Sequence, residues 1–345
     1  MKNIFLLSGL AITALASLLV GVVATTPADL WHWINIGSPD MQIIFADIRS
    51  PRIVLAALTG FVLGMAGAVV QGFLRNHLAE PSLLGASNSA ALGAVIAIYF
   101  GFAGIQIEGQ IAGQLIVPIS AVAGALISVS LLFIFASGNR GGGKEGARSM
   151  RLILAGFAVS ALAGAGVSLA LNLSPNIFAA LEIAFWLLGA VENRSWHHIT
   201  LIAPFVLVGC VCLWRTRTAL DALALGDDVA ASLGVNMQRL SFLVVVGVAL
   251  AVGAVVSVTG VIGFVGLIAP HLVRISYRNK GVARPATLVL SSGLAGAWLL
   301  VAADTLIRLI PTPTEMKLGV ITAFLGVPVL LALLRARKSS LAISE

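Results

Sequence analysis

The stretch RSPRIVLAALTGFVLGMAGAVVQGFLRNHLAEPSLLG, residues 49–85, joins one long apolar run to a strongly polar segment. The run that follows Pro51 is long enough to cross about 30 Å of hydrocarbon as a helix, and proline suits a helix's first turn. Three glycines share one face of that helix and predict close packing against a neighbour, namely Gly60, Gly64 and Gly67. The polar segment, residues 75–81, must lie at a membrane surface or line a water-filled path. We therefore expect a membrane helix followed by a polar hairpin.

Apolar runs of this kind recur along the whole chain. Hydrophobic residues make up 59% of the sequence and charged residues 10%, which is too little charge to cover an ordinary water-facing surface. The runs are continuous and do not alternate, so they favour helices over strands. We expect one transmembrane domain, residues 1–345, with about ten spans near residues 4–25, 52–74, 86–103, 113–136, 151–171, 198–214, 241–258, 262–276, 285–308 and 318–334.

The basic residues indicate how these spans are oriented. With the amino terminus inside, only five of the 21 lysines and arginines fall on outer loops or span ends. These five are Arg49, Arg52, Arg194, Arg308 and Lys317. Both termini are then cytoplasmic. The net charge of +7 comes from basic residues in short loops between apolar runs, where they orient a membrane protein, so no nucleic-acid partner is implied. The eighth span is interrupted by glycines, and a nine-span alternative would place Arg335, Arg337 and Lys338 outside.

The first apolar run, residues 4–24, could be read as a secretory signal behind Lys2. The run is long, however, and no convincing small-x-small cleavage site follows it. A retained first helix is therefore the favoured interpretation.

A second informative segment, LGDDVAASLGVN at residues 225–236, lies between two expected spans. It reads as a short cytoplasmic helix with Asp227 and Asp228 at its positive amino end and Gly234 available for a left-handed carboxyl cap. Such a helix suits docking to another protein, whereas a structural turn is the alternative.

Several kinds of chemistry are disfavoured. The five histidines are scattered, and no nucleophile, metal set or acid pair of an intramembrane enzyme is evident. Residues 138–144 resemble a phosphate-binding loop, but Glu145 stands where serine or threonine must hold magnesium. Ion-coupled carriers place carboxylates or histidines at mid-membrane, and this chain shows almost none there. The energy for any transport must then come from elsewhere, with a secondary transporter or channel acting alone as the alternative.

Four segments together resemble the FecCD family of permeases, the membrane subunits of importers for iron-siderophores, haem and vitamin B12. The first family pattern is Arg-x-Pro-Arg, a later Gln, and Asn-Pro-Leu-Ala-x-Pro before Leu-Gly. Here it appears as RSPR (49–52), Gln71, NHLAEP (76–81) and LG (84–85), with His77 in place of a proline. The others are residues 225–234, GVIGFVGLIAPHLVR (260–274, with Val261 for proline) and GVITAFLGVP (319–328), which follows an EMKLG segment where the family has Glu-Leu-Pro-x-Gly.

The resemblance implies an all-α polytopic protein with the BtuC-like fold of type II ATP-binding-cassette importer permeases. It implies a non-enzymatic subunit in a bacterial inner membrane that translocates a metal chelate, with an iron-siderophore as the favoured cargo and haem or cobalamin as alternatives. Its partners would be a second copy of itself, an ATPase dimer that uses ATP and magnesium, a periplasmic binding protein and lipid. This chain itself would bind no cofactor or metal.

The resemblance also assigns roles to residues of this sequence. Binding-protein docking falls to Arg49, Arg52 and Arg308, with snorkelling to head groups as the alternative, and for Arg308 an ion pair with Asp304 four residues earlier. ATPase coupling falls to a segment at about residues 219–238 that includes Leu225, Gly226, Asp227, Asp228, Ala231, Leu233 and Gly234. A cytoplasmic gate falls to Asn76 and Leu78, with Ser149 and Met150 as a second constriction. His271 is expected to be structural.

Overall fold

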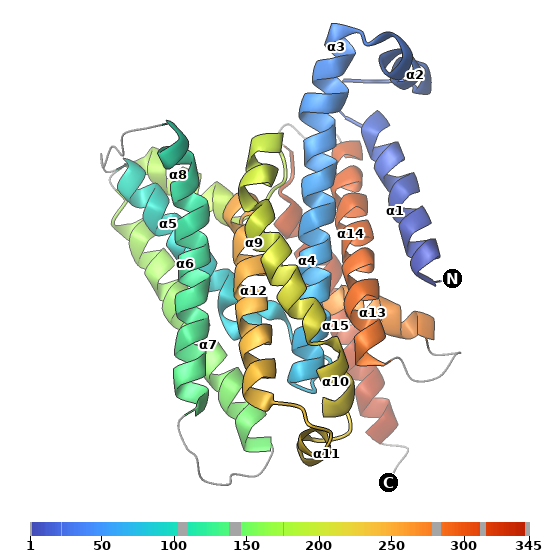
Figure 1. Cartoon of the computed structure of the whole chain (residues 1–345). Helices are drawn as coiled ribbons and strands as arrows, with labels where there is room; N and C mark the ends of the chain where they lie inside the picture. Colours follow the sequence, from blue (N-terminus) through green and yellow to red (C-terminus); the bar gives the residue numbers. More distant parts are fainter. Residues whose placement is uncertain are drawn as a thin grey trace.

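The computed structural model describes residues 2–21, 23–102, 110–137, 146–174, 176–277, 284–310 and 315–341, and these residues form helices without strands (Figure 1). The α-helices are α1 (Lys2–Leu19), α2 (Pro27–Ile36), α3 (Pro39–Gln42), α4 (Ser50–Phe73), α5 (Ala86–Phe102), α6 (Gln110–Ser137), α7 (Gly146–Asn172), α8 (Ile177–Leu187), α9 (Trp196–Arg215), α10 (Arg217–Leu223), α11 (Asp227–Ser232), α12 (Met237–Thr259), α13 (Val265–Tyr277), α14 (Pro285–Leu309) and α15 (Leu318–Leu341). A π-helix, Ile43–Arg49, and a 3-10 helix, Pro81–Leu84, complete them. The expected all-α fold is confirmed.

Each of the ten expected spans overlaps one of these helices. By length and composition, five described stretches can cross a membrane, namely Pro39–Phe73, Leu154–Asn172, Trp196–Leu223, Met237–Thr259 and Pro285–Leu309. Two further helices, α2 and α8, lie between the expected spans. Helix α8 has 11 residues, about 16 Å, so no search for full spans would find it. Its only local signal is Asn176, whose side chain accepts a hydrogen bond from the Ala179 N–H at 2.9 Å.

Helix α4 lies in the interior and packs against α14 and α13 through its glycine face. A Cβ atom added at Gly60 would stand 2.2 Å from the Gly296 carbonyl oxygen of α14. A Cβ atom added at Gly67 would stand 1.9 Å from the Gly266 carbonyl oxygen of α13. Side chains therefore cannot be accommodated there, and the predicted close packing is confirmed.

The eighth expected span is short and begins irregularly. Helix α13 has 13 residues, about 20 Å, which is less than the hydrocarbon thickness of about 30 Å. Between α12 and α13 the backbone takes positive φ angles at Gly260 (69°) and Phe264 (66°). Two other segments contact this break, because the Ala190 N–H donates to the Thr259 carbonyl oxygen at 2.7 Å and the Phe264 N–H donates to Glu80. Irregular backbone within a membrane is tolerated where protein shields it from lipid.

The two ends of the bundle differ. Helices α2 and α3 lie at one end, and α10 and α11 lie at the opposite end (Figure 1). Helix α1 packs along α14, where the Trp298 Nε1–H donates to Thr13 Oγ1 at 2.9 Å. The polar groups that the sequence singles out gather at these two ends.

Candidate functional site

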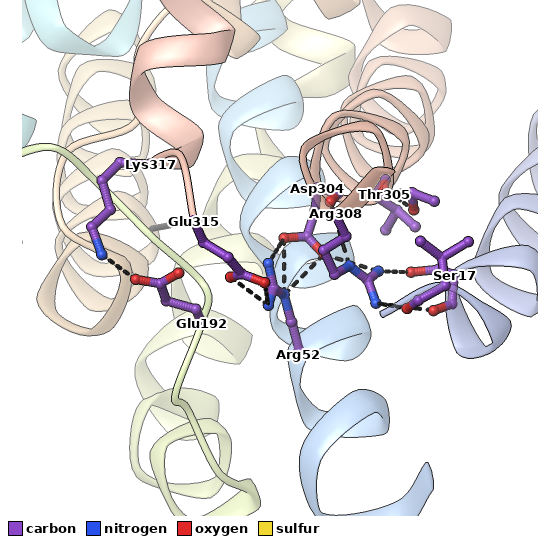
Figure 2. Close-up of polar contacts among 10 residues, drawn as sticks. Ser17, Arg52, Glu192, Asp304, Thr305, Arg308, Glu315 and Lys317 are labelled. Atoms are coloured by element: carbon purple, nitrogen blue, oxygen red, sulfur yellow. Dashed lines mark hydrogen bonds and ion pairs between the residues drawn. The ribbon is translucent and has the colours of Figure 1, made fainter. Parts of the chain in front are cut away.

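Four charged side chains meet near the start of α4 and the end of α14 and form the outer ion cluster: Arg52, Asp304, Arg308 and Glu315 (Figure 2). Asp304 is 1% exposed and lies between the two arginines. Arg52 donates to its Oδ1 from Nε at 3.0 Å and from Nη2 at 2.9 Å, while Arg308 Nη2 lies 3.1 Å from Oδ2. Arg52 Nη1 also donates to Glu315 Oε2 at 2.9 Å. Buried charges are tolerated when they are paired and hydrogen-bonded in this way.

The outer ion cluster is extended by a second pair on neighbouring loops. Lys317 Nζ donates to Glu192 Oε1, and Glu192 lies beside Glu315 (Figure 2). Desolvation acts to raise the pKa of Glu192, but hydrogen bonds with Glu315 and Lys317 and the charge of Lys317 lower it overall. Desolvation, followed by the hydrogen bond with Glu192, raises the pKa of Glu315. Of the two adjacent carboxyl groups, Glu315 is therefore the one that holds a proton more readily.

Two of the three predicted docking arginines hold the end of α1. Arg49, 5% exposed, donates to Thr25 Oγ1 at 2.6 Å, to the Val23 carbonyl oxygen at 2.5 Å and to that of Leu18. Arg308 donates to the carbonyl oxygens of Ser17 at 3.0 Å and Val20 at 2.8 Å. Cations at a helix carboxyl end satisfy carbonyl groups that have no partner inside the helix.

These contacts bear directly on the docking hypothesis. The Asp304–Arg308 pair, which the four-residue spacing predicted, is confirmed. All three arginines line one open cavity of about 1280 Å³, and α8 contributes the aromatic residues Phe178, Phe185 and Trp186 to its wall. Arg52 retains 13% exposure of its side chain, against 4% for Arg308. Docking stays a prediction.

At the opposite end, residues 74–85 between α4 and α5 form the inner hairpin. The Asn76 side-chain oxygen accepts a hydrogen bond from the Leu78 N–H at 3.0 Å, which closes a local turn. Arg75 takes a left-handed conformation with φ 49°. The gate assigned to Asn76 and Leu78 thus lies in a polar hairpin, as expected, and its gating role stays a prediction. Ser149 and Met150 belong to helix α7, but the structure describes only their backbone, so the second constriction stays a prediction.

The predicted short helix between two spans is confirmed as α11, which is followed by Gly234 in the left-handed region (φ 82°). It begins after Gly226 (φ 117°) with Asp227 and Asp228 in its first turn. Leu225 and Leu233 are exposed at its two ends, and Ala231 is also exposed. An exposed apolar and acidic helix that protrudes from the bundle is suited to contact a partner. That this partner is an ATPase is not tested by these contacts.

The remaining predictions concern ligands. Among the described residues, no three histidine, cysteine, aspartate or glutamate side chains lie close enough together to hold a metal ion. The loop at residues 138–144 that resembles a phosphate-binding loop lies outside the described residues.

Comparison with known proteins places these features in context. The model of the FecCD transport family matches residues 9–336 of the chain. The chain belongs to the FecCD transport family. A hemin transport system permease protein of Yersinia pestis is 35% identical to this FecCD chain, covering 96% of it and 94% of the relative. A vitamin B12 import system permease protein of Vibrio cholerae is 34% identical, covering 96% and 93%.

A solved structure gives the same result for the fold of this FecCD chain. It is described as an inward-facing conformation of a metal-chelate type ABC transporter, and it matches with a TM-score of 0.79 and 27% sequence identity. The match covers 97% of this chain and 98% of the other. The resemblance drawn from four sequence segments is therefore confirmed for the family and the fold.

Several polar contacts of the FecCD chain could not have been named from the sequence. Glu315 was quoted only as part of a family-like segment and was given no role, yet it pairs with Arg52. Glu80 accepts a hydrogen bond from the Phe264 N–H at 2.5 Å across a large sequence separation. The only advance signal was charge itself, because a carboxylate between apolar segments needs a partner.

Proposed function

We propose that this chain is the transmembrane permease subunit of an ATP-binding-cassette importer that carries a metal chelate from periplasm to cytoplasm. An iron-siderophore is the favoured cargo, with haem and cobalamin as the other candidates. The main support is that nearly the whole chain agrees in sequence and fold with transporter permeases, including permeases for hemin and vitamin B12. The protein supplies the membrane path, and it hydrolyses no ATP.

The proposal assigns an inner-membrane location with both termini in the cytoplasm. Helix α1 ends at the outer ion cluster, since Arg308 binds its last carbonyl groups, so its first residue lies toward the other side. Helix α15 begins beside Glu192 and Lys317 and runs 24 residues, about 36 Å, away from them. The excess of basic residues on the same side agrees with this orientation.

The proposed partners are a second copy of the chain, an ATPase dimer and a periplasmic binding protein. Helix α11 and its flanking leucines would meet the ATPase, and the outer arginines would meet acidic residues of the binding protein. ATP-driven closure of the ATPase would then shift the two permease copies between outward-open and inward-open states.

Reconstitution tests the function. Purified permease should retain an ATPase subunit encoded with it. The assembled complex in liposomes, supplied with the periplasmic binding protein, should take up an iron chelate only when ATP and magnesium are present in the compartment that the ATPase faces. Transport by the permease alone in ATP-free vesicles would contradict the importer and support an ion-coupled carrier or channel. Uptake of labelled siderophore, haem and cobalamin by a strain that lacks the gene identifies the cargo.

Docking needs a separate test, and Arg52 is the probe because its side chain keeps 13% exposure. Arg52 also pairs with Asp304 and Glu315, so only variants that assemble with the ATPase are compared. Arg49 and Arg308 support α1, so their substitution confounds docking with folding. We expect the Arg52→Lys variant to retain part of the binding-protein stimulation of ATP hydrolysis and the Arg52→Glu variant to lose it. Unchanged stimulation in a correctly assembled Arg52→Glu complex would rule out docking at this residue.

A further inference from the structure

The inner hairpin contacts the segment proposed to meet the ATPase. Arg75 Nη2 lies 3.4 Å from Asp227 Oδ1, and Asp227 is the first residue of α11. Both side chains are partly exposed, at 34% and 27%. The turn that presents Arg75 is fixed by the backbone, because the Asn76 N–H donates to the Gln71 carbonyl oxygen at 3.1 Å.

The other end of the inner hairpin is tied to the break before α13. Glu80 Oε1 accepts a hydrogen bond from the Phe264 N–H at 2.5 Å. Pro81, which is buried, packs so closely on Gly266 that a Cβ atom added at Gly266 would stand 2.7 Å from the Pro81 Cδ atom. This end is held by a hydrogen bond and by packing rather than by an exposed ion pair.

The hairpin therefore connects an exposed element, α11, to the more buried backbone before α13. Hydrogen bonds to a charged group in a low-dielectric interior hold their geometry better than an exposed ion pair does. A displacement of α11 would pull Arg75 through Asp227, while Glu80 would hold the far end of the hairpin against α13. Asn76 and Leu78 lie between these two attachments.

We propose that the Arg75–Asp227 ion pair transmits movement of α11 to the inner hairpin, and that Glu80 fixes the pivot about which the hairpin turns. Arg75 and Glu80 are thus positioning residues for the transport cycle. The inference rests on the proposed function, in which α11 contacts the ATPase. A second route exists, because the Asp221 carboxylate accepts a hydrogen bond from the Ala286 N–H at 2.8 Å and ties α10 to α14. The experiment must therefore measure how much coupling the hairpin carries.

A charge exchange in the reconstituted permease–ATPase complex, supplied with its binding protein, tests the ion pair. The Arg75→Glu and Asp227→Arg single variants each place like charges together, and we expect transport per ATP hydrolysed to fall by on the order of threefold or more. The double exchange restores the opposite charges and should recover most of that loss. Arg239→Glu, on an exposed arginine of α12 at the same end, is the matched control and should leave the ratio unchanged.

Glu80 is tested by a conservative pair of variants. Glu80→Gln keeps a carbonyl oxygen for the Phe264 N–H and should retain coupling, whereas Glu80→Ala removes it and should uncouple ATP hydrolysis from transport. Retention of the ATPase on the purified permease shows that each variant is folded and assembled. If Glu80→Ala does not assemble, the comparison of Glu80→Gln with the wild type still decides, because a loss of coupling there contradicts a role as hydrogen-bond acceptor.

The outcomes separate this inference from the proposed function. A wild-type complex without ATP-driven transport contradicts the function itself. A working wild type whose single charge reversals leave the ratio unchanged overturns only the role of the ion pair. Impaired single variants that the double exchange does not repair overturn it as well, since the defect then arises from docking or folding.

Discussion

The outer ion cluster and the inner hairpin are both polar breaks in an apolar bundle, yet their charges are held differently. Asp304 is 1% exposed and binds two guanidinium groups. Arg75 and Asp227 are 34% and 27% exposed, and their nearest atoms are 3.4 Å apart. Buried pairs are costly to break, while exposed pairs are screened by water and salt. The comparison indicates a fixed frame at the outer end and an adjustable connection at the inner end.

The largest effect is expected at Asp304. The Asp304→Ala variant leaves Arg308 without its carboxylate and Arg52 with Glu315 alone, and removal of one partner from a buried pair costs about 3–5 kcal/mol. We expect the free energy of unfolding in detergent, measured by denaturant titration, to fall by that amount. Asp47→Ala, on an exposed carboxylate near the same end, should change it by less than about 0.5 kcal/mol. If the two variants lose the same free energy of unfolding, burial of the carboxylate does not determine the cost of removing it.

A smaller loss is expected at Arg49. Lysine keeps the positive charge in the Arg49→Lys variant, but its single ammonium group cannot reproduce the guanidinium contacts with Leu18, Val23 and Thr25. The cost should be on the order of 2 kcal/mol, as for hydrogen bonds to a charged group. The end of α1 should also become more susceptible to protease, whereas an Arg239→Lys control should behave as the wild type. Unaltered protease resistance would mean that Arg49 does not hold α1.

Local sequence signals predicted a large part of this architecture. Apolar length located ten helices, glycine spacing located the face of α4 that meets α14, and the four-residue spacing of Asp304 and Arg308 predicted their pair. The acids and glycine around α11 predicted its existence and its carboxyl cap. Each of these features depends on residues within a single helix and its caps, which is the range over which sequence pattern is informative.

The contacts that the sequence did not reveal are long-range or involve the backbone. Arg52 pairs with carboxylates on α14 and on the loop before α15, and no spacing rule connects them. Arg49 binds mainly carbonyl oxygens, which every residue carries, so its buried role leaves no mark in the residue pattern. Helix α8 is too short to appear as a span. Such features are fixed by how the helices pack, and only the folded chain shows them.

At the inner end, Gly234 offers a test with a local effect. Its φ of 82° lies in the left-handed region, and the space around it is open, so the Gly234→Ala variant loses about 1 kcal/mol through backbone conformation alone. We expect faster amide hydrogen exchange in α11 with little change in the outer ion cluster. Gly164→Ala in α7, where the added Cβ atom also meets open space but φ is helical, should not destabilise the protein. Slower exchange of α11 in Gly234→Ala would contradict the adjustable connection.

The smallest effect on stability is expected for Asp227→Ala, and it tests the comparison most sharply. The variant removes the exposed pair with Arg75 and a carboxylate at the amino end of α11, so the cost should be about 1 kcal/mol or less. At 1 M salt the Debye length is about 3 Å, and this cost should shrink toward zero. The loss in Asp304→Ala should persist in the same salt, because water and ions do not reach a side chain that is 1% exposed. If salt reduces both losses equally, the charges at the two ends are held in the same way. The exposed Arg75–Asp227 pair then does not make the inner end more adjustable than the outer end.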